Sequence, residues 1–224
     1  GTLVFHGEGG SSAQAAIDTT AAGDLWDNGY GISSSNDPSA SAGGDNMLVY
    51  TLPSMVDGIA VTASYAPRTA GAIDSSASFG VGYTGIEGLS LNWATGEDNS
   101  AVATTVDVNT MKISYAIGSF SVGYSDTDYD SESTTVTADQ NVRSYNVSYT
   151  VSENISVGYG IESISQPNDT TANHTDIEVS ALTASYTAGG MTLSAMMGEA
   201  DNIAHTTSAA EDKEMWHLVA SFAF

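Results

Sequence analysis

Short segments in which apolar and polar residues alternate recur along most of this chain. In Tyr145–Val151 and again in Ile155–Ile161, every second residue is aliphatic or aromatic, and the residues between them are Ser, Asn, Thr or Gly. This period of two predicts β-strands with one apolar and one polar face. Only residues 152–154 separate the two segments, which indicates a hairpin with a very short turn. By the same criterion we expect about eleven strands after residue 45 and a short one at residues 2–6.

The connections between the predicted strands alternate strictly between short and long. The short ones are residues 54–57, 85–88, 117–119, 152–154 and 188–190. The long ones are residues 67–75, 97–104, 126–141, 165–175 and 200–213, and they carry most of the Asp, Glu and Asn. Tight turns at one rim and long polar loops at the other are typical of an up-and-down membrane β-barrel.

A soluble β-sandwich or β-barrel would also alternate apolar and polar residues. Its polar face would normally carry Lys, Glu and Arg, whereas here that face is mostly Ser, Gly, Thr and Asn, which suits a water-filled lumen. No stretch approaches the roughly 20 apolar residues that a membrane helix needs. Aromatic residues fall on the apolar face, often near a strand end, as in interfacial girdles; they are Tyr65, Tyr83, Trp93, Tyr115, Tyr124, Tyr149 and Trp216. These features favour a transmembrane barrel.

The charge of the chain narrows the range of partners. There are 27 acidic and 4 basic residues, a formal net charge of −23, and no Cys. Nucleic acid is excluded as a partner, because its phosphates need Lys and Arg to neutralise them. The lack of Cys removes disulfides and thiolate chemistry.

The end of the chain and two internal strands resemble a known family. The last predicted strand, Met215–Phe224, alternates and ends on an aromatic residue, which resembles the C-terminal signature of outer-membrane barrels. Asp57–Tyr65 and Phe79–Gly85 resemble strands of the general diffusion porins of alphaproteobacteria. This resemblance implies an outer-membrane location in a Gram-negative bacterium, contact with membrane lipids and lipopolysaccharide, and a homotrimer. It also implies a sixteen-stranded barrel in which the loop after the fifth strand folds into the lumen.

On that pattern, the chain forms a single barrel domain with about twelve of the sixteen strands. Residues 1–7 are the end of a strand, residues 8–45 are the lumen-folded constriction loop, and residues 46–224 form eleven further strands. We expect the N-terminal strands to be missing. The alternative is a smaller barrel of twelve strands.

Residues 8–45 are rich in Gly, Ser, Ala and acids and are long for a connection without secondary structure. Carboxylates in a constriction would attract cations and discourage anions. The alternative is an ordinary solvated external loop. Lys112 lies on a polar strand face, so it should point into the lumen, and Arg143 should pair with carboxylates near the loop-side rim. The residues that we expect at the pore constriction are Glu8, Asp18, Asp24, Asp27, Asp37 and Lys112.

One acidic stretch could bind calcium. Asp126, Asp128 and Asp130 place carboxylates at every second residue, and Ca²⁺ prefers six to eight oxygen ligands. The stretch lacks the spacing of an EF-hand, and the alternative is a hydrated acidic loop. No cofactor is required by any other feature of the sequence.

The function expected from these features is passive diffusion of small hydrophilic solutes and ions, with a preference for cations. The alternatives are a substrate-specific channel and a structural or adhesive barrel with a plugged pore. We expect no enzyme activity. The sequence has no GxSxG motif, and its four scattered His residues include no HExxH pair.

Overall fold

The computed structural model describes the chain except for residues 18, 33–45, 68–73, 102–103 and 224. Its main feature is one sheet of twelve strands, accompanied by the short 3-10 helices η1 (Leu25–Asp27) and η2 (Ala209–Glu211). The strands are β1 (Thr2–His6), β2 (Met47–Thr51), β3 (Ile59–Ala66), β4 (Ser76–Tyr83), β5 (Leu89–Ala101), β6 (Thr104–Ile117), β7 (Phe120–Ser131), β8 (Gln140–Ser152), β9 (Ile155–Ser165), β10 (Ile177–Ala188), β11 (Met191–Asp201) and β12 (Lys213–Phe222). The prediction of eleven strands after residue 45 and a short one before it is confirmed.

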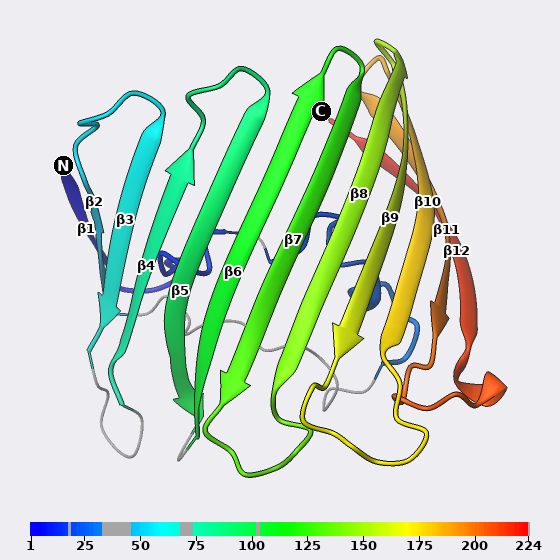
Figure 1. The fold of residues 1–224 in the computed structure, drawn as a ribbon. Coiled ribbons are helices and arrows are strands. Elements are labelled where there is room, and N and C mark those ends of the chain that lie inside the picture. Colours follow the sequence, from blue (N-terminus) through cyan, green and yellow to red (C-terminus); the bar gives the residue numbers. More distant parts are fainter. Residues whose placement is uncertain (18, 33–45, 68–73, 102–103, 224) are drawn as a thin grey trace.

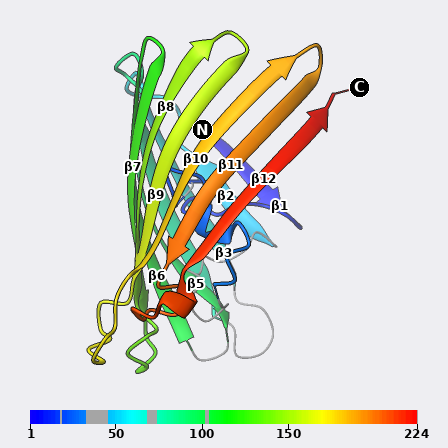
Figure 2. The same cartoon turned by 90° about the vertical axis from the view of Figure 1, so that its right-hand side faces the viewer.

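Each strand pairs with the next one in the chain, so the sheet has an antiparallel up-and-down topology with β1 and β12 at its edges. The short connections lie at one rim, at the top in Figure 1, and the long ones lie at the other. The sheet is strongly curved, as Figure 2 shows from the side. We call its concave side the inner face and its convex side the outer face.

Two of the predicted long loops, 97–104 and 126–141, are shorter than expected. β5 continues to Ala101 and β6 begins at Thr104, while β7 continues to Ser131 and β8 begins at Gln140. In β7 the added residues keep the period of two and pair with β8, as in Asp128 with Asn141, so their backbone groups are hydrogen bonded. In β5 the pairing with β6 shifts register between Asp98 and Ala101. The acids had marked both stretches as loops, although in β7 they take outward positions on a strand.

The two faces differ as the alternation predicts. Large apolar side chains on the outer face are exposed, among them Trp93, Tyr145, Leu182 and Trp216. The inner face carries small or polar residues over much of its area, and residues 7–32, without residue 18, cover part of it. Within the described parts of the chain, no helix is long and apolar enough to span a membrane.

An apolar cluster lies between the inner face and the segment that follows β1. Leu25 and Tyr30 of this segment are almost completely buried against side chains of β6 to β11 and the following loop. The wall side of the cluster consists of Val108, Tyr129, Val142, Ile164, Ile177, Val179, Ala181, Met196, Ala200 and Ile203. Burial of apolar surface, at about 25 cal/mol per Å², therefore holds this segment to the wall.

Candidate functional site

The most distinctive part of the molecule is the segment after β1, which runs across the inner face of the sheet (Figures 1 and 2). We call residues 7–32, without residue 18, the inner segment. Its backbone amides donate to hydroxyl groups of the wall: Ala13 to Ser64 at 3.0 Å and Gln14 to Ser78 at 3.3 Å. Further along, the Thr127 hydroxyl of β7 donates to the Thr19 carbonyl at 3.1 Å. Small hydroxyl side chains of the inner face thus satisfy backbone groups of the inner segment.

Glycines of the inner face make room for the same segment. A Cβ atom at Gly160 of β9 would lie 2.7 Å from Ala22 Cβ, and one at Gly198 of β11 would lie against the Tyr30 hydroxyl. A Cβ at Gly96 of β5 would approach Gln14 Cβ to 3.1 Å. These distances are shorter than ordinary van der Waals contact, so the inner segment can lie this close only where the wall has no side chain.

Glu162 of β9 is a buried acidic residue that contacts the inner segment, and it is 0% exposed. One carboxylate oxygen accepts the Trp26 N–H of η1 at 3.2 Å, and the other accepts the Ser144 hydroxyl at 3.3 Å. The Ser144 oxygen in turn accepts the N–H groups of Ala21 at 3.1 Å and Ala22 at 2.8 Å. The Trp26 N–H, a donor of the first turn that has no partner within η1, therefore has an acceptor on the wall.

Sequence reasoning missed Glu162. It is the only acidic residue of β9. On the same face of the strand it follows Gly158 and Gly160, which have no side chains. A single carboxylate on the predicted lumen face could have indicated an anchor. Its partner Trp26 could not have been found from the local sequence, because it lies 136 residues away in the chain.

Lys112 lies on the inner face of β6, as predicted, and its Nζ donates to the Thr20 carbonyl of the inner segment at 2.6 Å. Next to it, the Gln14 side chain donates to the Thr110 hydroxyl at 3.2 Å. The lysine therefore contributes a positive charge to the inner face and also fixes the inner segment.

The predicted constriction acids have different positions. Glu8, Asp24 and Asp27 belong to the inner segment and are exposed. Asp24 accepts a hydrogen bond from the Thr20 hydroxyl at 3.0 Å, and its own N–H donates to that hydroxyl at 2.8 Å. Asp18 and Asp37 lie outside the described residues.

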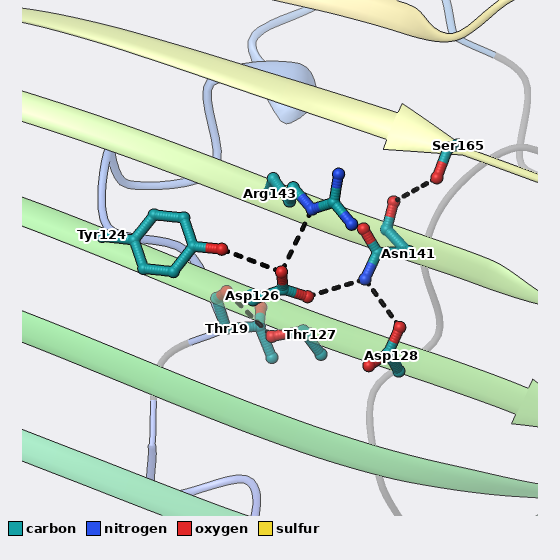
Figure 3. Close-up of polar contacts among 8 residues, drawn as sticks. All are labelled: Thr19, Tyr124, Asp126, Thr127, Asp128, Asn141, Arg143 and Ser165. Atoms are coloured by element: carbon teal, nitrogen blue, oxygen red, sulfur yellow. Dashed lines mark hydrogen bonds and ion pairs between the residues drawn. The ribbon is translucent and has the colours of Figure 1, made fainter.

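Asp126, Asp128 and Asp130 lie on β7 and not in a loop, and they share the outer face with Tyr124. The Asn141 side chain donates to Asp126 at 2.7 Å and to Asp128 at 2.6 Å, as Figure 3 shows. Arg143 pairs with Asp126 at 3.1 Å, which confirms the expected ion pair. Among the described residues, no group of three or more His, Asp or Glu is arranged to hold a metal ion. Calcium binding by these acids stays a prediction.

Comparison with known families decides the class of the protein. The family model described as Gram-negative porin matches residues 7–174, which include the inner segment and most of the wall that holds it. The chain belongs to the Gram-negative porins. It is therefore a protein of the bacterial outer membrane, and the family and fold indicate a channel rather than an enzyme.

Solved porin structures share this fold at low sequence identity. A mutant of the Rh. blastica porin superposes with a TM-score of 0.63 at 14% identity over 97% of this chain and 71% of that one. OmpT of Vibrio cholerae gives a TM-score of 0.60 at 18% identity over 99% of this chain and 71% of that one. An anion-selective porin from Comamonas acidovorans gives 0.53 at 18% identity over 70% of this chain. This porin spans 49% of the length of the Comamonas protein. No curated protein matches the present chain.

Membership of the family explains the two faces of the sheet. The outer face of this porin exposes large apolar and aromatic side chains, which would be unfavourable in water but are suited to lipid. The inner face, with its hydroxyl groups, glycines and Lys112, is the surface available to solutes and to the inner segment.

Proposed function

We propose that this porin provides a water-filled path for passive diffusion of small hydrophilic solutes and ions, and that residues 8–45 form the constriction of that path. The observation that supports this proposal most is a row of hydrogen bonds between the inner segment and the wall. Backbone N–H groups of the segment donate to Ser64, Ser78, Ser144 and Glu162, and Lys112 donates to the segment. A loop held at so many points keeps a constant position, which a size-limiting constriction requires.

We further propose that the path prefers cations. Glu8, Asp24 and Asp27 of the inner segment are exposed, whereas Lys112 donates to a backbone carbonyl. Exposed carboxylates beside a narrow path raise the local concentration of cations. The anion-selective Comamonas porin has a related fold. Selectivity must therefore follow from the charged residues of each chain and not from the fold.

We also propose that the porin works as a homotrimer in contact with lipopolysaccharide. The exposed apolar outer face, which extends from β1 to β12, offers area for both lipid and subunit contacts. Cross-linking in membranes and native mass spectrometry of the extracted protein would show three copies if this is right.

A second candidate function is that of a structural barrel whose lumen is blocked. The observation in its favour is the apolar cluster around Leu25 and Tyr30, which fills the space between the inner segment and β6 to β11. Diffusion then requires open space on the other side of the inner segment.

Single-channel recording in planar bilayers under a KCl gradient separates these functions. Open steps with a cation-selective reversal potential are the expected result. An anion-selective potential would contradict the proposed cation preference alone. The absence of current from protein whose insertion has been verified would overturn the diffusion pathway and favour the structural barrel.

A further inference from the structure

Two histidines that are far apart in the sequence meet at the long-loop rim. His174 lies in the loop between β9 and β10, and His205 lies in the loop between β11 and β12. Their rings are stacked, with centroids 5.0 Å apart and planes inclined by 16°. The same two loops are joined by a backbone bridge between His174 and Thr206 and by a hydrogen bond from Thr175 N to the His205 carbonyl at 3.1 Å. The histidine pair is therefore the centre of a contact between two loops.

The hydrogen bonds of the two rings show where their protons are. Nδ1 of His205 lies 3.0 Å from the Thr175 carbonyl oxygen, which can only accept, so this nitrogen carries a proton. Nδ1 of His174 lies 3.3 Å from a carboxylate oxygen of Asp169, which likewise accepts. In the neutral rings, both Nε2 atoms are consequently without a proton.

An added proton can only go to Nε2, and that position is unfavourable in the closed contact. Both Nε2 atoms are buried, and neither has a hydrogen-bond partner in the parts of the chain that the structure describes. His205 is only 4% exposed. Protonation would leave a charged N–H without an acceptor and place it beside a second imidazole. The ring of His205 has only a neutral carbonyl as its direct partner, whereas the ring of His174 has the Asp169 carboxylate.

Carboxylates of three loops lie at this rim, and two of them, Asp169 and Asp176, favour the charged form of His205. On the β9–β10 loop, Asp169 accepts the Thr171 N–H at 2.8 Å, and Asp176 follows the contact. On the β7–β8 loop, Asp139 accepts a hydrogen bond from Asn168. On the β11–β12 loop itself, Asp212 accepts the Asn202 N–H at 3.3 Å. None of these carboxylates is hydrogen bonded to the His205 ring.

From this geometry we infer that the His174–His205 pair is an acid-sensitive latch, which joins the β9–β10 and β11–β12 loops at neutral pH and releases them when the solution becomes acidic. The His205 backbone supports this view, because its φ of 56° lies in the left-handed region that non-glycine residues rarely adopt. The contacts of the closed latch offset the cost of this backbone conformation. Once those contacts weaken, the cost favours separation of the two loops.

The direction of the pH dependence follows from the burial of His205. Burial has the largest effect and lowers the pKa of this histidine in the closed latch. The nearby His174 also lowers this pKa, while the hydrogen bond to Thr175 and the carboxylates of Asp176 and Asp169 raise it by less overall. The closed latch is fully stable above the ordinary histidine pKa of about 6.5. It loses stability as the pH falls from there toward the lowered value, by up to about tenfold in the ratio of closed to open forms for each pH unit.

Distance measurements between the two loops test this latch. Thr170 and Thr207 are exposed, one on each of the two loops, and the chain has no native Cys, so Thr170→Cys and Thr207→Cys can carry two spin labels. Pulsed electron spin resonance on the labelled protein in lipid vesicles should give a narrow distance distribution at about pH 7.5 and a broad, longer one at about pH 5, on either side of the histidine pKa. An unchanged distribution at the two pH values would overturn the latch.

Variants identify the sensor. His205→Phe keeps a stacking ring but cannot be protonated, so the narrow distribution should persist at the lower pH; His205→Gln is a second neutral replacement if the Phe variant does not fold. His217→Phe is the matched control, because His217 lies at a pocket of the inner face away from the loops and should leave the pH response intact. Equal broadening in folded His205 variants, or loss of the response in the His217 variant, would contradict the assignment. This readout involves no ion current, so it is independent of the proposed diffusion pathway.

Discussion

The Glu162 carboxylate stands out at the scale of single residues, because it satisfies backbone donors of a segment that is remote in the chain. Its two oxygens accept from Trp26 and Ser144, and Ser144 extends the network to Ala21 and Ala22. A buried network of this kind is favourable only while every member keeps its partner.

The first prediction concerns this carboxylate. Glu162→Ala leaves the Trp26 N–H without an acceptor, at a cost of about 1–3 kcal/mol. The inner segment should become mobile, and single-channel records should show more open-channel noise and a larger mean conductance. Glu162→Gln retains one oxygen acceptor and should show a smaller change.

Glu178→Ala is the matched control, since Glu178 is exposed on β10. It should behave like the wild type. Identical records for Glu162→Ala and Glu178→Ala would contradict the anchoring role of Glu162.

Lys112 gives a second prediction at this scale. Lys112→Met keeps the apolar stem but removes the charge and the donation to Thr20. One unit charge acting over about 10 Å of water contributes about 0.4 kcal/mol, or roughly a twofold change in the ratio of cation to anion permeability. The reversal potential should therefore move toward stronger cation preference at about 0.1 M KCl and much less at about 1 M, where charges are screened within about 3 Å. An unchanged reversal potential at about 0.1 M KCl would show that Lys112 does not act on permeating ions.

At the scale of elements, two kinds of wall position hold the inner segment: polar side chains that bind it, and glycines that leave space for it. Hydroxyl groups and a carboxylate bind its amides, and glycines allow it to approach the strands. The position of the inner segment is thus determined by several strands at once.

The third prediction tests this fit. The methyl group in Gly160→Ala would come within 2.7 Å of Ala22 Cβ and 3.0 Å of a Leu25 methyl, so the inner segment must shift. Overpacking of this kind costs about 1–3 kcal/mol. Gly160→Ala should increase conductance and speed proteolysis within residues 8–45. In the control Gly82→Ala, the new methyl meets only the flexible Asn92 side chain, and both readouts should stay unchanged.

The whole molecule is a curved sheet whose two faces meet different solvents. Its stability in the membrane depends on keeping charge off the outer face, whereas the inner face tolerates polar residues. Adjacent residues of one strand therefore differ in whether they tolerate substitution by a charged residue.

Leu182 and Thr183 provide the fourth prediction. Leu182 is 56% exposed on the outer face at mid-strand in β10, so Leu182→Arg should cost about 2–4 kcal/mol. Thr183 lines a pocket of about 200 Å³ on the inner face, and its hydroxyl donates to the Gly158 carbonyl at 3.3 Å. Thr183→Arg should therefore cost only the value of that hydrogen bond, about 0.5–1.5 kcal/mol. Urea unfolding in lipid vesicles measures both values. A larger loss for Thr183→Arg than for Leu182→Arg would reverse the assignment of the two faces.

The strands could be predicted because their signal is local. In Tyr145–Ile161 the alternation, the short turn and the choice of residues all lie within one hairpin, and the structure has β8 and β9 there. The same locality allowed Lys112 to be placed on the inner face. The same local reading was wrong at Asp126 and Asp130, where acids on the outer face of β7 were predicted to belong to a loop.

The sequence by itself therefore determined the antiparallel sheet, the identity of its two faces and the acidic character of the chain, since a period of two is a property of neighbouring residues. Only the tertiary structure decided which wall residues hold the inner segment. Glu162 reaches Trp26, Gly160 receives Ala22 and His174 stacks on His205 because the curvature of the sheet brings distant strands and loops together. No local pattern encodes those distances.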